Sequence, residues 1–225
     1  MLKKLMAFTL TTLISAQVFA EAPAKINHIF TLPIKSMKVV DSNGELYFMS
    51  ENGRYVFRGE LFDAWYRKEI DNVKDLQQTA NRLDFSKMGI KLDGLATLTL
   101  GHGPKKATLF VDPRCPYCHG VLKDAQHLVN DYTFTVVPVP ALGDKSNQLD
   151  KVLACTANKK KALEALINEK IDQLPQSKKD CDLSAYNKTL VTAQVLGING
   201  VPVVIAPDGR MMRGRPLNLK RFLEA

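Results

Sequence analysis

Two cysteines with two residues between them, Cys115 and Cys118, are the strongest chemical signal in this chain. A cysteine attacks a disulfide as its thiolate, so a pair at this spacing can exchange electrons with other cysteines. Pro116 suits the first position of a helix, where its missing N–H has no intrahelical partner. Unpaired N–H groups at a helix start, together with the charge of Arg114, favour the thiolate of Cys115. We therefore predict that Cys115 is the nucleophile and Cys118 the resolving thiol.

Four further residues are candidates for supporting roles at this site. Asp112 could accept or relay the proton of Cys118, or could serve only as a turn residue. Tyr117 could contact a bound substrate or act as a spacer. Val201-Pro202 precedes an apolar strand, and a cis bond there would place this backbone beside the cysteines and offer N–H and C=O groups to an extended peptide. A proline at a strand start is also commonplace, so the residue alone favours this only weakly.

Two cofactor alternatives use the same cysteines. With His119 the motif also fits Cys-x-x-Cys-His, the attachment signature of c-type haem. A haem protein would leave the second cysteine pair and the N-terminal hairpins without a role, so we keep it as a remote alternative. A four-cysteine zinc site is weaker still, because Cys155 and Cys181 lack the short paired spacing of zinc ligands. We expect no cofactor and no metal.

The second cysteine pair, Cys155 and Cys181, is interpreted as a structural disulfide. An even number of cysteines in an exported chain favours disulfides. This pair would close a loop of 27 residues, for which the chain-entropy model gives roughly 3–4 kcal/mol of stabilisation.

The N-terminal segment, residues 1–20, is predicted to be a cleavable signal peptide. Lys3 and Lys4 precede an apolar run too short to cross a bilayer permanently, and cleavage after Ala20 would follow small residues at the −3 and −1 positions. Cleavage lowers the net charge from +8 to +6, because 8 minus the two lysines is 6. No run of five or six like charges indicates nucleic-acid binding, so the basic excess indicates a solvated surface.

The elements that must position these residues fall into three parts. In residues 21–65, strand-like segments are separated by Asn43-Gly44 and Asn52-Gly53, the strongest short signal for a hairpin. Three short strands cannot bury a core alone, so this unit is expected to pair with something, such as a second copy. Residues 66–104 are expected to form a linker. Its narrow apolar stripe, Ile70 to Leu83, predicts a helix that either packs on its own domain or connects two domains.

Residues 105–225 alternate between strand and helix. A short apolar strand at Ala107–Val111 leads directly to Cys115, and a helical face follows. The remaining expected elements are strands at Thr133–Val139, Val201–Ile205 and Arg210–Arg213, and helices around Leu149–Asn168, Ser184–Leu196 and Leu217–Glu224. This order predicts an α/β unit with an inserted helical portion.

Together these residues resemble the periplasmic disulfide isomerases of the DsbC/DsbG family. The resemblance rests on Phe110 to His119, on Gly197 to Pro202, on the order of the second cysteine pair, and on Met37–Val40, Leu46 to Gly53, Arg58-Gly59 and Phe62-Asp63. The cysteine motif alone indicates only a thioredoxin-like protein, whereas the hairpin unit is typical of this family's dimerisation domain. The resemblance implies an α+β chain: a thioredoxin-like C-terminal domain with a helical insertion, a small antiparallel β dimerisation domain and a helical linker.

The resemblance also implies a V-shaped homodimer in the periplasm, with an apolar cleft for wrongly bridged exported proteins. Cys115 would attack a client disulfide, and the mixed disulfide would resolve through Cys118 or another client thiol. In the family, a membrane reductase, DsbD, keeps the nucleophile reduced.

This sequence departs from the family pattern at several points, which leaves alternatives open. The isomerases usually have threonine before the cis-proline, whereas this chain has Val201, as the oxidase DsbA does. Pro116-Tyr117 between the cysteines resembles DsbG and glutaredoxins more than DsbC. The mature N-terminus looks shorter, and the stretch from Trp65 to Cys115 longer. A net oxidase or reductase for one dedicated client, or a chaperone that shelters clients in the cleft, are therefore competing functions.

Overall fold

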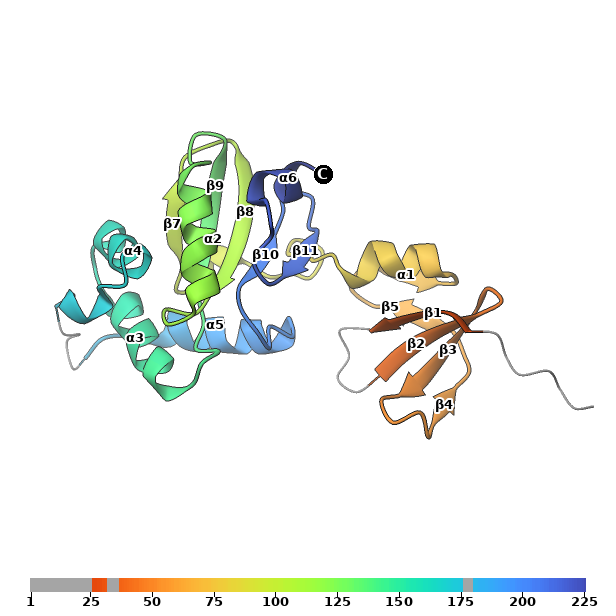
Figure 1. Cartoon of the computed structure of the whole chain (residues 1–225). Helices are drawn as coiled ribbons and strands as arrows, with labels where there is room; N and C mark the ends of the chain where they lie inside the picture. Colours follow the sequence, from red (N-terminus) through yellow and green to blue (C-terminus); the bar gives the residue numbers. More distant parts are fainter. Residues whose placement is uncertain (1–25, 32–36, 176–179) are drawn as a thin grey trace, which may run out of the picture.

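The computed structural model describes residues 26–31, 37–175 and 180–225. The predicted signal peptide, residues 1–20, lies outside the described residues. Within these ranges, no helix has the length and apolar character needed to cross a membrane. Figure 1 shows an N-terminal β unit and a larger C-terminal unit, with α1 lying over the sheet of the first.

The N-terminal unit is a four-stranded antiparallel sheet in chain order. Its strands are β1 (Ile26–Thr31), β2 (Met37–Ser42), β3 (Glu45–Ser50) and β4 (Val56–Phe57). The predicted Asn43-Gly44 turn joins β2 to β3, and both of its residues have positive φ, 57° and 88°. Two residues at positive φ match the right-handed twist of the strands, which is why Asn-Gly is favoured here. Sequence patterns missed β1, which pairs with β2.

The predicted linker differs from the structure at both of its ends. Its start at residue 66 falls inside a hairpin, because β5 (Leu61–Asp63) before it pairs with β6 (Lys68–Ile70) after it. Its α-helix, α1, spans Val73–Ala80. Ile70 and Leu76 pack with Val39 and Phe48 in one buried cluster. The helix therefore packs on its own domain, the simpler of the two alternatives. The stripe is divided, because Leu83 packs in the core of the C-terminal unit instead.

The C-terminal unit is a five-stranded sheet in the order β11-β10-β8-β9-β7, with helices around it. The strands are β7 (Leu98–Gly101), β8 (Lys105–Val111), β9 (Tyr132–Pro138), β10 (Val203–Ile205) and β11 (Met211–Arg213); the helices are α2 (Pro116–Gln126), α3 (Asp144–Cys155), α4 (Lys159–Ile167), α5 (Ser184–Val195) and α6 (Leu219–Glu224), with short 3-10 turns η1 (Leu92–Gly94) and η2 (Ile171–Gln173). β7 lies in the range expected to be linker, yet it pairs with β9 as an edge strand of this sheet.

The central strand β8 positions the cysteine motif. It is parallel to β9 and antiparallel to β10, and α2 connects it to β9. Alternate side chains point to opposite faces: Leu109 and Val111 join the core under α2, whereas Phe110 joins the core that contains Ala193 of α5. Both faces of β8 are thus covered, and the short loop after Val111 leads to the start of α2 (Figure 1).

Backbone contacts tie the segment after α1 to the C-terminal sheet. The N–H of Leu83 donates to the carbonyl of Gly209 at 2.8 Å, and the N–H of Met211 donates to the carbonyl of Asn81 at 2.7 Å. Gly209 has φ +85°, and a Cβ there would lie 2.8 Å from the Leu83 carbonyl oxygen. A glycine is needed at this position because the two backbones approach so closely.

Candidate redox site

The two cysteines lie at the start of α2. Cys115 is the N-cap residue, with extended backbone (φ −87°, ψ 116°), and Pro116 occupies the first helical turn. Both thiols are free; Cys115 is 5% exposed and Cys118 is fully buried. The strand, turn and helix thus place the motif as the sequence predicts, with Cys118 the more shielded thiol. The side chain of Cys115 makes no cap hydrogen bond, and its carbonyl accepts from the N–H groups of Cys118 and His119 at 3.0 and 3.1 Å.

Burial dominates the electrostatics of Cys118. It raises the pKa of this thiol well above its usual range, and a hydrogen bond from the Asp112 N–H to the sulfur, at 3.3 Å, acts in the opposite direction. At neutral pH Cys118 is therefore a neutral thiol. It needs to lose its proton before it can resolve a mixed disulfide, because only the thiolate attacks.

The Val201-Pro202 bond is cis, the alternative that the sequence favoured only weakly. The Val201 carbonyl oxygen lies 3.8 Å from the sulfur of Cys115 and accepts from its thiol. Pro202 is buried, and its own carbonyl accepts from the Gly214 N–H at 2.7 Å. Residues 86 positions apart in the sequence are thus brought together at one site.

Asp112 is fully buried, and its carboxylate has three donors. These are the backbone N–H groups of Arg114 and Leu142 and the hydroxyl of Ser146, each at 2.8 Å. The carboxylate therefore holds the turn before Cys115 against the start of α3, which fits the turn alternative. Its backbone N–H contacts the resolving sulfur, so the relay of a proton from Cys118 stays a prediction.

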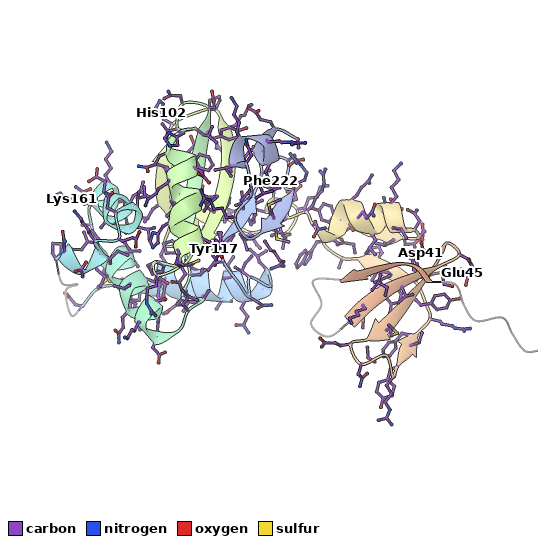
Figure 2. All side chains as sticks on the ribbon, in the orientation of Figure 1. Asp41, Glu45, His102, Tyr117, Lys161 and Phe222 are labelled. Carbon is purple, nitrogen blue, oxygen red and sulfur yellow. A yellow bond between two sulfur atoms is a disulfide. The ribbon has the colours of Figure 1, made fainter. Side chains whose placement is uncertain are left out.

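The other motif residues divide into an exposed and a buried set. Tyr117 is 69% exposed at the start of α2 (Figure 2), where it is accessible to a substrate. Arg114 is exposed, and no carboxylate among the described residues forms an ion pair with it. His119 is buried, and its Nε2–H donates to the Pro113 carbonyl at 3.0 Å. Sequence reasoning considered His119 only in the haem alternative, but this residue helps to hold the turn that carries Cys115.

A groove of about 670 Å³ begins beside the cysteines and has a mainly apolar lining. Tyr117, Val201 and Pro202 line it nearest the motif, and Leu217 lies fully exposed further along. Part of its wall is the Arg215 guanidinium, which forms two 2.9 Å hydrogen bonds to Asp124. The sequence gives no signal for this groove, because its residues come from α2, the cis-proline loop and the loop before α6.

The second pair, Cys155 and Cys181, forms a disulfide with a Cα–Cα distance of 5.9 Å. Cys155 is the last residue of α3, and Cys181 precedes α5. The bond joins the inserted helices to the rest of the domain. Among the described residues, no cluster of three or more His, Cys, Asp or Glu side chains is arranged to hold a metal ion.

Family comparisons fit both units of the fold. Residues 95–224, more than half of the chain, match the thioredoxin-like domain family. The chain belongs to the thioredoxin-like family. Residues 11–75 match the N-terminal domain of the disulfide bond isomerase proteins, known as DsbC. The two matches in this order make the chain a thiol:disulfide interchange protein of the DsbC type and confirm the predicted α+β fold and enzyme class.

Full-length relatives and solved structures are consistent with this assignment. The chain is 22% identical to the thiol:disulfide interchange protein DsbC of Escherichia coli K12, over 92% of this chain and 85% of that protein. It is 24% identical to DsbC of Haemophilus influenzae, over 85% and 81%. In fold it is similar to a disulfide interchange protein from Neisseria gonorrhoeae (TM-score 0.50, 22% identity, 60% of this chain and 96% of that one). It is also similar to Proteus mirabilis ScsC in a compact conformation (0.51, 18%, 67% and 83%).

Proposed function

We propose that this protein is a disulfide isomerase of the periplasm, exported through a cleaved signal peptide, that rearranges non-native disulfides in other exported proteins. The observation that carries the proposal is the position of Cys115. Its sulfur lies at a helix start, 3.8 Å from the carbonyl of the cis Val201-Pro202 segment, while the second thiol is fully buried behind it. One thiol is placed to meet a client, and the other is withheld from it.

The reaction follows from the chemistry of the two thiols. The thiolate of Cys115 attacks one sulfur of a client disulfide, a bond forms between them, and the second client sulfur leaves as a thiolate. When another client thiolate attacks the mixed disulfide, the client leaves with a new bond and Cys115 is released reduced. When Cys118 attacks instead, the client leaves reduced and the Cys115–Cys118 pair is oxidised. A membrane reductase similar to DsbD would then return two electrons.

The groove beside the motif supports an unfolded or wrongly bridged client as the substrate. Tyr117 at its mouth and the apolar side chains further along suit an extended, partly apolar segment on either side of a client cysteine. The Val201 backbone could pair with such a segment, as extended peptides pair with exposed strand edges. The other supporting residues, Asp112, Arg114 and Pro116, act on the thiolate and its turn rather than on the client.

A homodimer is proposed from the N-terminal unit. β4 is a short edge strand of two residues, Val56 and Phe57, and both side chains are more than half exposed. Tyr55 next to them is equally exposed. An edge strand that presents apolar side chains is a template for pairing with another strand, and a second copy of this unit would cover it. Light scattering should give the mass of a dimer, and a monomer would contradict the cleft model.

A trapping experiment tests the isomerase proposal. The Cys118→Ala variant should accumulate mixed disulfides with exported proteins, because Cys115 can still attack but cannot be released by its partner. Wild-type protein should reactivate scrambled ribonuclease, and Cys115→Ser should not. Thiol alkylation of the exported protein should find Cys115 and Cys118 mostly reduced.

A net oxidase or reductase is the second candidate, and one observation favours it. The backbone carbonyl of Val201 contacts the Cys115 sulfur, and the valine side chain at this position has no hydroxyl, unlike a threonine. The same alkylation experiment separates the two functions, since a mostly oxidised pair would favour the oxidase. A cleft chaperone would keep its sheltering activity in Cys115→Ser.

A further inference from the structure

Asp150 is a buried carboxyl group that the reaction above does not use. It lies in α3, is 1% exposed, and neither of its oxygens has a hydrogen-bond partner among the described residues. It borders a cavity of about 10 Å³ that is also lined by Lys159 from α4 and Tyr186 from α5. Neither neutralises it directly: the Lys159 amine donates to the carbonyl of Ala154 at 2.8 Å, and the Tyr186 hydroxyl donates to Asn147 at 2.8 Å. A lone ionised carboxylate in such a place is costly.

A short path of contacts leads from Asp150 to the redox pair. Ser146 lies four residues earlier in α3, so it shares a helix face with Asp150. The Ser146 hydroxyl donates to the carboxylate of Asp112, whose backbone N–H donates to the sulfur of Cys118. Asp112, Asp150 and Cys118 are all at least 99% buried, where charges interact strongly because little water screens them.

The charge of Asp112 acts on both Asp150 and Cys118. Burial, and then the negative charge of Asp112, raises the pKa of Asp150 to about 8. The charge of Asp112 also contributes to the raised pKa of Cys118. The charged or titratable groups that face Asp150 are therefore Asp112 from the end of β8, Lys159 from α4 and Tyr186 from α5.

We propose that Asp150 is a redox-linked positioning residue: it gains a proton when the Cys115–Cys118 disulfide is reduced and loses it when the disulfide forms. This rests on the proposed function, in which these two cysteines cycle. Reduction creates a thiolate in the site, and added negative charge favours the neutral form of a nearby carboxyl group. Asp150 would thereby set how strongly the reducing power of the pair depends on pH.

The exchange with glutathione shows where each atom goes. Two glutathione thiols supply two electrons; the Cys115–Cys118 bond breaks, and the bond of glutathione disulfide forms. One of the two thiol protons ends on Cys118. The other is released while Cys115 is a thiolate, and it goes to Asp150 where that carboxyl group is ionised and to solvent where it is not.

The test compares wild-type protein with Asp150→Asn in glutathione buffers at about pH 6 and about pH 9.5, on either side of the Asp150 transition. At the higher pH the variant lacks a negative charge that disfavours the reduced pair. Its equilibrium should shift about threefold toward the reduced form, about 14 mV at 29.6 mV per tenfold change. At the lower pH both proteins have a neutral group at this position, and their equilibria should coincide. A purely structural effect of the substitution would change the equilibrium constant by the same factor at both pH values.

Asp144→Asn is the matched control, because it removes an exposed carboxylate from the first turn of the same helix. It should behave as wild type at both pH values. The proposal is overturned if the equilibrium constants of Asp150→Asn and wild type have the same ratio at both pH values. If the wild-type pair fails to equilibrate with glutathione at all, the proposed function fails instead, so the two failures are distinguishable.

A measurement on wild-type protein alone covers the case in which Asp150→Asn does not fold. Infrared difference spectra between the oxidised and reduced forms at about pH 8 should show a protonated carboxylic acid band that grows on reduction. The carbonyl frequency of the band distinguishes the two buried carboxyl groups, because Asp112 has three hydrogen-bond donors and the Asp150 oxygens have no partner among the described residues. Absence of this band overturns the proposal.

Discussion

One cysteine pair of this protein lies near the start of α3, and the other includes the last residue of that helix. The two pairs differ in their surroundings and in whether they are bonded. At the start of α3, Ser146 contacts Asp112 beside the free thiols of Cys115 and Cys118. At its end, Cys155 is bonded to Cys181. The first pair lies at a helix start, beneath a cis-proline loop and next to a groove. The second joins the end of α3 to the chain before α5.

The comparison shows that the surroundings of a cysteine pair decide its use. A bond between Cys115 and Cys118 closes too small a loop to constrain the unfolded chain, so its formation and loss have little effect on the fold. The bond between Cys155 and Cys181 closes a loop across 26 positions, and the unfolded chain loses much more freedom through it. The first pair can therefore cycle while the second pair holds the domain together.

The largest expected difference is in activity. Cys115→Ser should lower disulfide exchange by about a thousandfold or more, because a covalent mechanism has no route without its nucleophile, while the free energy of unfolding stays almost unchanged. The double variant Cys155→Ser with Cys181→Ser should keep most of its exchange activity at temperatures where it is folded. Insulin reduction, followed by turbidity, measures the exchange activity of both variants. Equal losses in the two variants would contradict the division of roles.

The next effect concerns Asp150, which lies on α3 between Ser146 and Cys155. Its folded pKa, about 8, lies above the value of about 4 for an unfolded aspartate. The protonated form is thus favoured by folding: the stabilisation is complete below about pH 4 and is lost as the pH rises toward 8. The contribution of Asp150 to the free energy of unfolding should fall by several kcal/mol over this range.

Asp150→Asn removes this dependence, so its stability relative to wild type should rise with pH. Urea unfolding of the oxidised proteins at about pH 4, 6 and 8 measures the difference. Parallel curves for the two proteins would show that Asp150 is ionised in the folded state at neutral pH.

Local patterns predicted the elements around the first pair well. The apolar strand before Cys115, the proline after it and the helical face that follows are each encoded within a few residues, so sequence sufficed for β8 and α2. The Asn43-Gly44 hairpin was predictable for the same reason. Family resemblance, and not periodicity, supplied the order of the domains.

What sequence reasoning missed depends on contacts between distant segments. β7 was assigned to the linker, because only its pairing with β9 shows that it belongs to the C-terminal sheet. Asp150 belongs to no sequence motif, and only its burial and the charge of Asp112 distinguish it from Asp144, the exposed carboxylate of the same helix. The sequence suggested only the haem alternative for His119, because its contact with the Pro113 carbonyl exists only in the folded turn.

The disulfide itself gives the third prediction. The double variant Cys155→Ala with Cys181→Ala should lose about 3.5 kcal/mol of unfolding free energy, the value for a loop of this length. Urea unfolding measures it, and the two single variants serve as controls for the loss of each side chain. A loss below about 1 kcal/mol would mean that the inserted helices are held by their packing, and the second pair would no longer count as a brace.

The smallest effect comes from a matched pair of hydrogen bonds, one beside each cysteine pair. Ser146 donates to the buried carboxylate of Asp112, near Cys118, and Ser184 donates to the exposed carboxylate of Asp182, next to Cys181. Ser146→Ala leaves a buried carboxylate with one donor fewer and should cost about 1–3 kcal/mol. Ser184→Ala exposes its acceptor to water and should cost less than about 0.5 kcal/mol. Thermal unfolding compares them, and equal costs would show that the site around Asp112 is no more tightly organised than the surface near the disulfide.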